Sequence, residues 1–177
     1  FMFACAMYPG DSTFVENVKQ EATEQVTRLR NHTCIALWCG NNEVDEGWRN
    51  WGWQKQFNYS KTDSAKIWND YLNLFHNVIP NVISKLCPPL EGAGGGIYHP
   101  SSPMIGWGKK ESLLRGDSHY WGVWWGMEPF DVYEKKVGRF MSEYGFQGMP
   151  DYLTLNHYGD SLDLNSSYIK SHQKHPT

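Results

Sequence analysis

Two glutamates in this sequence each follow a short apolar run. The run Cys34–Cys39 leads through Gly40 and two asparagines to Glu43, and the segment Val137–Ser142 leads to Glu143. A carboxylate at the carboxyl end of a buried strand is where α/β barrels place their chemistry. Two such carboxylates from different strands can cleave a glycosidic bond, one as nucleophile and the other as proton donor.

Retaining glycoside hydrolysis requires two carboxyl groups about 5 Å apart. At that distance their negative charges repel, so one group is held protonated while the other stays ionised. The stretch between Glu43 and Glu143 has room for about three strand–helix units, so only the fold can bring the pair together. The alternative is that both are surface residues after strands, but their neighbours include Gly, Trp and Phe rather than a charged run.

The first part of the chain is expected to run strand, helix, strand. Phe1–Met7 is an apolar, strand-like run, and Thr13-x-x-Glu16 has the form of a capping box. Apolar residues then recur at spacings of three and four, which predicts an amphipathic helix: Val15, Val18, Ala22, Val26 and Leu29. The run Cys34–Cys39 is typical of a strand covered on both faces.

The rest of the chain is expected to alternate loops, helices and strands. A long loop with at most one helical turn is expected over Asp45–Ser60, and an apolar stripe from Trp68 to Leu86 predicts a helix that Pro80 kinks or splits. The later segments are a glycine-rich connection at Glu91–Gly96, a strand-like run in Asp117–Gly126, a short helix in Phe130–Lys136, a strand at Arg139–Glu143 and a polar tail from Asp160.

These segments predict an α/β fold with a parallel sheet, because strands joined by helices have right-handed crossovers. We expect about five strands, too few to close an eight-stranded barrel. The chain has 177 residues, against roughly 250 in a complete barrel of that kind. Since Phe1–Met7 opens the sequence without a leader or linker, we expect an excised piece of a larger protein.

Composition excludes several classes of protein. A net charge of -3 without a basic stripe argues against a nucleic-acid partner, and no apolar run approaches the roughly 20 residues of a membrane span, so we expect a soluble protein. The four cysteines have no metal-binding spacing and are expected to be buried free thiols: Cys5, Cys34, Cys39 and Cys87. We expect no metal and no cofactor.

Two motifs resemble those of family 2 glycoside hydrolases. The segment Trp38–Glu43 resembles their acid/base motif, and Phe140–Gln147 resembles their nucleophile motif. Three flanking segments are most similar to bacterial β-mannosidases: Phe1–Pro9, Gly47–Trp53 and Gly116–Gly122. The resemblance extends over nearly the whole chain up to Pro150.

This resemblance implies a role for three residues and a place in a barrel. Glu43 would be the acid/base after barrel strand four, Glu143 the nucleophile after strand seven, and Asn42 a hydrogen-bond partner of the sugar 2-hydroxyl. The chain, residues 1–177, would be the C-terminal part of an incomplete (β/α)8 TIM barrel, roughly strands three to seven. The first barrel strands and the family's β-sandwich domains would be absent from it.

Aromatic residues are further candidates for the sugar site, since sugar CH faces pack on indole rings. We expect Trp51, Trp121 and Trp125 to line the pocket, although each could merely fill a gap. His119 and Tyr120 stand near a strand end, where they could contact a sugar hydroxyl or the nucleophile, although a lone histidine is more often structural.

The resemblance implies a retaining exo-glycosidase that releases terminal β-D-mannose from β-mannosides and manno-oligosaccharides. One alternative is another exo-acting enzyme of the same family, a β-galactosidase or a β-glucuronidase. A second is that the isolated piece is non-catalytic and only binds sugars or self-associates through exposed sheet edges. The compartment stays open, with a bacterial periplasm or secretion as candidates.

Overall fold

The structure, a computed structural model, describes residues 3–88, 98–148, 150–157, 163 and 165–167. These residues form two compact units, the first ending at Ile105 and the second starting at Gly106. The expected connection Glu91–Gly96 and most of the polar tail lie outside the described residues. Over the described ranges, no helix is both long and apolar enough to cross a membrane.

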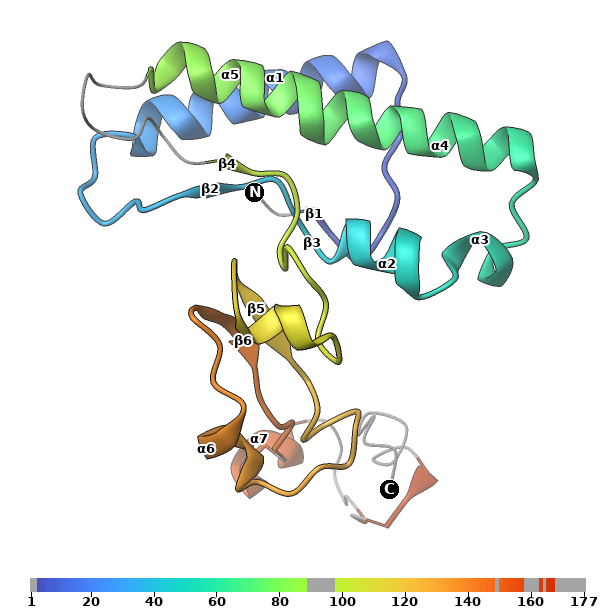
Figure 1. Cartoon of the computed structure of the whole chain (residues 1–177), viewed down its shortest axis with the longest axis vertical. Helices are drawn as coiled ribbons and strands as arrows, with labels where there is room; N and C mark the ends of the chain where they lie inside the picture. Colours follow the sequence, from blue (N-terminus) through green and yellow to red (C-terminus); the bar gives the residue numbers. More distant parts are fainter. Residues whose placement is uncertain (1–2, 89–97, 149, 158–162, 164, 168–177) are drawn as a thin grey trace. The chain divides into compact units, whose positions relative to one another are not determined.

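Short parallel strands lie at the centre of the first unit (Figure 1). Strand β1 (Phe3–Ala4) pairs with β3 (Asn41–Asn42), and β2 (Trp38–Cys39) pairs with β4 (Tyr98–His99). Because Gly40 alone separates β2 from β3, residues 38–42 form one central stretch between β1 and β4. A Cβ on Gly40 would lie 2.4 Å from the Tyr98 hydroxyl oxygen, so this close pairing requires glycine.

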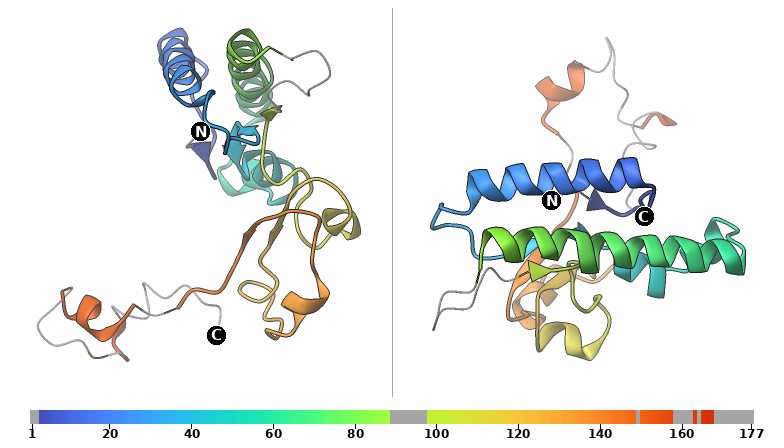
Figure 2. Two further views of the ribbon diagram at one scale, coloured as in Figure 1. Left: turned by 90° about the vertical axis from the view of Figure 1, so that its left-hand side faces the viewer. Right: turned by 90° about the horizontal axis from the view of Figure 1, so that it is seen from above.

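Two long helical segments lie side by side along these strands (Figures 1 and 2). One is α1 (Ser12–Leu29), whose predicted apolar stripe is confirmed, with Val18, Ala22 and Val26 buried. It packs against α5 (Ile79–Leu86), which contributes Ile79 and Ile83 to the same core. Full burial of such a side chain stabilises a fold by about 1.5–3 kcal/mol, so this helix pair anchors the first unit.

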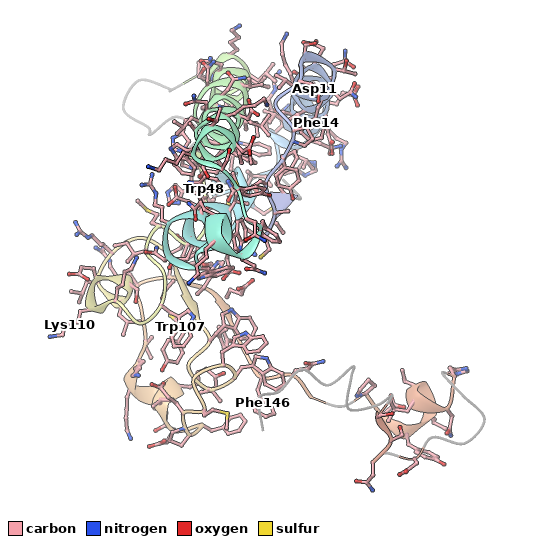
Figure 3. All side chains as sticks on the ribbon, turned by 90° about the vertical axis from the view of Figure 1, so that its right-hand side faces the viewer. Asp11, Phe14, Trp48, Trp107, Lys110 and Phe146 are labelled. Atoms are coloured by element: carbon pink, nitrogen blue, oxygen red, sulfur yellow. The ribbon has the colours of Figure 1, made fainter. Side chains whose placement is uncertain are left out.

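The predicted capping box at Thr13 is wrong. The N-cap of α1 is Asp11, whose Oδ1 accepts a hydrogen bond from the backbone N–H of Phe14 at 3.0 Å. Both residues stand at the start of the helix in Figure 3. A carboxylate cap of this kind satisfies one of the four unpaired N–H groups that every helix start presents.

The second long segment contains the interruption that Pro80 predicts. It consists of α4 (Lys61–Asn73), a π-helical turn η1 (Leu74–Val78) and α5, with Pro80 in the first turn of α5. Proline has no N–H to donate to a carbonyl of the preceding turn. The carbonyl of Phe75, five residues before Pro80, instead accepts a hydrogen bond from the Tyr98 hydroxyl at 2.7 Å. The interruption thereby ties the helix to β4.

The predicted loop over Asp45–Ser60 is wrong, because this region contains α2 (Val44–Asn50) and α3 (Trp53–Gln56). Neither helix is long enough to show an apolar period. Trp48 and Trp53 are buried, so tertiary packing stabilises these short helices. Gly47 lets the Trp53 ring approach, since a Cβ there would lie 2.4 Å from that ring.

The predicted doubly covered strand Cys34–Cys39 is also wrong in its first part. Only Trp38 and Cys39 pair with another strand, and Cys34 and Ala36 are exposed. None of the four cysteines is buried, and none forms a disulfide. The apolar composition of this run reflects the packing of Trp38 and Ile35 on the helix layer rather than coverage of both faces.

The second unit is built on another parallel pair. Strand β5 (Ser118–Tyr120) pairs with β6 (Met141–Tyr144), where strand-like segments were predicted. Its helical segments are η2 (Lys110–Leu113), α6 (Val132–Lys135) and α7 (Tyr152–Asn156). The short helix predicted in Phe130–Lys136 is confirmed as α6. The described residues thus form a mixed α/β protein with short parallel strands.

Candidate active site

Glu43 occupies the junction between β3 and α2, at the carboxyl end of the central strand stretch. Its φ is +62°, a left-handed conformation that is strained for a residue with a Cβ and that recurs at functional sites. The backbone holds this conformation: the Glu43 N–H donates to the Ser102 carbonyl at 2.7 Å, and its carbonyl accepts from the Gly47 N–H at 2.8 Å. The side chain is half-buried.

Asn41 holds the junction between β3 and α2 in place through a buried network of hydrogen bonds. The side chain, 1% exposed, donates from Nδ2 to the Pro100 carbonyl at 2.7 Å. Its Oδ1 accepts from the Ser101 hydroxyl at 2.6 Å and from the Val44 N–H at 3.1 Å. Asn41 therefore fixes the first turn of α2 and with it the place of Glu43.

Asn42 and Glu43 share a contact with Cys5, which follows β1. The Cys5 thiol donates to Oε2 of Glu43 with an Sγ–O distance of 3.4 Å, and Nδ2 of Asn42 lies 3.7 Å from the same sulfur. The structure thus brings together two of the residues that the sequence singles out. A third partner, Cys5, comes from a strand far away in sequence.

The predicted sugar-binding residue Trp51 ends α2. It is 45% exposed, whereas its neighbours Trp48 and Trp53 are buried. The rings of Trp51 and Trp53 meet edge to face with centroids 5.9 Å apart. An exposed indole held by a buried one offers a fixed apolar face to solvent.

In the second unit, a β-bulge aligns Glu143 with His119. Ser118 pairs with Met141 and His119 pairs with Glu143, so Ser142 has no counterpart on β5. Bulges re-aim side chains and are frequent beside active sites. The Ser142 hydroxyl donates to the buried Asp117 carboxylate at 2.9 Å, which anchors the bulge.

Two nitrogen atoms converge on a single oxygen of Glu143. Nε1 of Trp121 donates to Oε2 at 2.8 Å, and Nδ1 of the buried His119 lies 3.1 Å from the same oxygen. Hydrogen bonds to a charged acceptor are stronger than neutral ones. The indole hydrogen bond, with the His119 nitrogen beside it, fixes the position of Oε2 of Glu143.

Tyr120 and Trp125 are placed differently from His119 and Trp121. Tyr120 is 3% exposed, and its hydroxyl donates to Oε2 of Glu128, whose Oε1 is paired with Nζ of Lys136 at 2.6 Å. The hydrogen bond from Lys136, and then that from Tyr120, lowers the pKa of Glu128. Trp125 is 53% exposed and packs edge to face on Trp124. Within the described residues, Tyr120 is thus anchored on Glu128 and Trp125 on Trp124.

Sequence reasoning did not identify Cys5 and Asn41. Asn41 is the neighbour of the predicted site residue Asn42. The two asparagines differ only in the face of the strand to which their side chains point. The sequence predicts a buried thiol at Cys5, whereas the structure exposes Cys5, and its contact depends on the pairing of β1 with β3. The fold and the site together define a class: an α/β protein with a glutamate at the carboxyl end of one parallel strand and another within a second.

Comparisons with known proteins give the relationship. No family model matches the sequence. The chain is 34% identical to β-mannosidase B of Thermothelomyces thermophilus over 163 residues and 32% identical to β-mannosidase B of Emericella nidulans, in each case over 89% of this chain and 18% of the relative. The crystal structure of the β-D-mannosidase from Dictyoglomus thermophilum matches with a TM-score of 0.66 and 37% identity, over 90% of this chain and 18% of that one.

The chain is therefore homologous to β-mannosidases. It spans about 18% of the length of the curated relatives it matches, and this portion carries both glutamates.

Proposed function

We propose that the full-length natural protein containing this chain is a retaining exo-glycosidase that releases terminal β-D-mannose from β-mannosides. It would be a family 2 glycoside hydrolase, and this chain would be part of its (β/α)8 barrel, roughly strands three to seven. The observation that carries the proposal is the convergence of Trp121 Nε1 and His119 Nδ1 on Oε2 of Glu143 in a homologue of β-mannosidases.

In the proposed first step, Oε1 of Glu143 attacks the anomeric carbon of mannose. The bond from that carbon to the glycosidic oxygen breaks, and the departing oxygen takes the proton from the Glu43 carboxyl. The products are a mannosyl ester on Glu143 and a free alcohol. Retaining chemistry requires the two carboxyl groups to act on opposite sides of this bond, about 5 Å apart.

In the second step, the Glu43 carboxylate removes a proton from water, and the water oxygen attacks the anomeric carbon. The ester bond to Glu143 breaks, which releases mannose with its original configuration and returns Glu43 to the protonated state. No metal or cofactor takes part in this scheme.

The remaining candidate residues would contact the sugar. Asn42 would bond the 2-hydroxyl, and Trp51, Trp121 and Trp125 would present indole faces to the ring. His119 would orient Glu143, and Tyr120 would support the pocket through Glu128. The exposed indole faces of Trp51 and Trp125 support this assignment.

A mechanism-based label tests the proposal directly. 2-Deoxy-2-fluoro-β-mannosyl fluoride carries its own good leaving group, and its fluorine slows the second step, so it should trap the ester on Glu143. Peptide mapping by mass spectrometry should locate the label there, and Glu143→Gln should abolish both labelling and turnover. Labelling at another residue, or full turnover in Glu143→Gln, would contradict the assignment.

The sugar preference needs its own measurement. A panel of nitrophenyl β-mannoside, β-galactoside and β-glucuronide on the full-length protein should show the highest kcat/KM for the mannoside. A higher value for another sugar would keep the two-glutamate mechanism but assign another exo-glycosidase.

A second proposal concerns the 177-residue chain alone, which we infer self-associates without appreciable hydrolysis. Large apolar side chains are exposed in both units, among them Met104 in the first and Val137, Phe140 and Leu153 in the second. Apolar exposure and unpaired strand edges favour association. Light scattering should show oligomers, and a monodisperse monomer with full β-mannosidase activity would contradict this inference.

A further inference from the structure

Cys5 and Glu43 stand opposite each other at the ends of two paired strands. The parallel register aligns Ala4 with Asn42, so the next residue of each strand is Cys5 and Glu43. The Cys5 N–H donates to the Asn42 carbonyl at 2.9 Å and extends the pairing to this point. The two side chains therefore leave neighbouring strands at the same level.

Both residues have left-handed backbones. Cys5 has a φ of +45° and Glu43 a φ of +62°, a region that residues with a Cβ rarely adopt. Such strain persists only where surrounding contacts enforce it, and it gathers at functional sites. Two strained residues side by side point to a constraint on where their side chains lie.

Their side chains meet in a short chain of polar contacts. The Cys5 thiol donates to Oε2 of Glu43 across 3.4 Å, and Nδ2 of Asn42 approaches the same sulfur at 3.7 Å. The thiol thereby links the amide and the carboxyl that the proposed mechanism uses. Cys39, in contrast, donates to the Asn41 carbonyl at 3.3 Å.

We propose that Cys5 is a positioning residue for Glu43, whose thiol holds the carboxyl in the orientation from which it transfers a proton to the glycosidic oxygen. This inference rests on the proposed acid/base role of Glu43. A positioned acid matters only where the leaving group needs a proton, which gives the inference a signature that a structural role lacks.

Two substrates distinguish a positioning role of Cys5 from a purely structural one. Mannobiose needs its leaving oxygen protonated, whereas 2,4-dinitrophenyl β-mannoside does not. For the full-length protein, Cys5→Ala should lower kcat/KM for mannobiose roughly tenfold and leave that for the dinitrophenyl substrate within about twofold. Cys5→Ser retains a donor and should recover most of the mannobiose activity. Cys34→Ala, at an exposed cysteine outside the site, should change neither value.

Chemical removal of the thiol proton tests the folded protein directly. In the Cys34→Ala background, the exposed Cys5 thiolate should attack methyl methanethiosulfonate, forming a methyl disulfide and releasing methanesulfinate. Labelled protein, with Cys5 modification verified by mass spectrometry, should show the same selective loss with mannobiose, and Cys5→Ser should be insensitive to the reagent. This measurement decides the matter even where Cys5→Ala does not fold.

The outcomes separate this inference from the proposed function. Glu43→Ala should lower kcat/KM for mannobiose by about 10²- to 10⁴-fold and spare the dinitrophenyl substrate. Full mannobiose activity in Glu43→Ala would refute the proposed function. If Glu43→Ala behaves as expected but loss of the Cys5 thiol affects both substrates equally, or neither, the positioning role alone is overturned.

Discussion

The indole N–H of Trp121 donates to Oε2 of Glu143 at 2.8 Å. The indole and the carboxylate belong to one unit, on the residue after β5 and on β6, so the contact is set by the register of this strand pair. The indole N–H thus engages Oε2 rather than Oε1 of Glu143. We infer that this geometry presents Oε1 to the anomeric carbon.

Replacing Trp121 with phenylalanine should therefore impair catalysis more than binding. Trp121→Phe keeps an aromatic face but loses the N–H, and a hydrogen bond to a charged group contributes about 1.5–3 kcal/mol. We expect kcat for nitrophenyl β-mannoside to fall about 10- to 100-fold with little change in KM, measured by steady-state kinetics.

The matched control is Trp107→Phe, an indole of the same unit that packs edge to face on Tyr120. It should keep kcat within about twofold, since among the described residues no hydrogen bond or ion pair joins its side chain to Glu143. An unchanged kcat in Trp121→Phe, or an equal loss in both variants, would show that the indole N–H does not orient the carboxylate.

The elements that the sequence predicts best are those with a long period. The spacing of Val18, Ala22 and Val26 predicts α1, and the structure buries these residues. Helices α2 and α3 escape prediction because they are too short to show a period and depend on Trp48 and Trp53 packing. The apolar run at Cys34 was misread because strand coverage depends on neighbours that the run does not contain.

In the candidate site, too, the sequence predicts the residues of a local motif but not those that depend on tertiary contacts. Glu43 and Asn42 stand out in the sequence because their segment resembles a known motif. Cys5 and Ser101 do not, because each acts through a partner about 40 or 60 positions away, and such pairing is set by strand register rather than local pattern. The converging contacts on Oε2 of Glu143 depend likewise on the bulge at Ser142.

The adjacent residues Asn41 and Asn42 should give opposite phenotypes. Asn41 is buried and makes three hydrogen bonds, so Asn41→Ala should lower the free energy of unfolding by about 3 kcal/mol. Among the described residues, the hydrogen bond of the Asn42 side chain is the long one to Cys5, so Asn42→Ala should change stability by less than about 0.5 kcal/mol while lowering kcat/KM.

Scanning calorimetry and steady-state kinetics on the full-length protein measure this pair. Asn41→Asp, which cannot donate to the Pro100 carbonyl, should resemble Asn41→Ala in stability. Equal melting temperatures for Asn41→Ala and Asn42→Ala would show that the buried network does not hold the junction.

Two tyrosines, the half-buried Tyr98 and the buried Tyr71, form a second matched pair. The Tyr98 hydroxyl donates a hydrogen bond to the Phe75 carbonyl in the turn before Pro80. Tyr98→Phe should therefore lower the free energy of unfolding by about 1–1.5 kcal/mol at neutral pH. The Tyr71 hydroxyl has no hydrogen-bond partner among the described residues. Tyr71→Phe should therefore change the free energy of unfolding by less than about 0.5 kcal/mol.

Tyr71 should also make the free energy of unfolding depend on pH in the alkaline range. Burial raises the pKa of Tyr71 to about 12, whereas an unfolded tyrosine titrates near 10. The neutral phenol is thus favoured by folding, so its contribution is complete below pH 10 and is lost as pH rises towards 12. Wild type should lose more stability than Tyr71→Phe between these values, and parallel curves from denaturant titrations would refute this.

The ion pair in the second unit should make stability depend on acid pH. The hydrogen bond from Lys136, and then that from Tyr120, lowers the pKa of Glu128. A lowered carboxyl pKa contributes stability above the unfolded value of about 4.3, and this contribution is lost as pH falls through the folded value. Glu128→Gln should therefore be less stable than wild type at pH 7 and no less stable near pH 3.

The solvent exposure of this ion pair limits the stability difference between wild type and Glu128→Gln. The side chains of Glu128 and Lys136 are 30% and 40% exposed, so we expect a difference at pH 7 of no more than about 1 kcal/mol. It should shrink in high salt, because screening weakens exposed pairs. Glu134→Gln, which removes a carboxylate at an exposed position of α6, is the control for the loss of a surface charge. A pH-independent difference in Glu128→Gln would assign its effect to packing rather than charge.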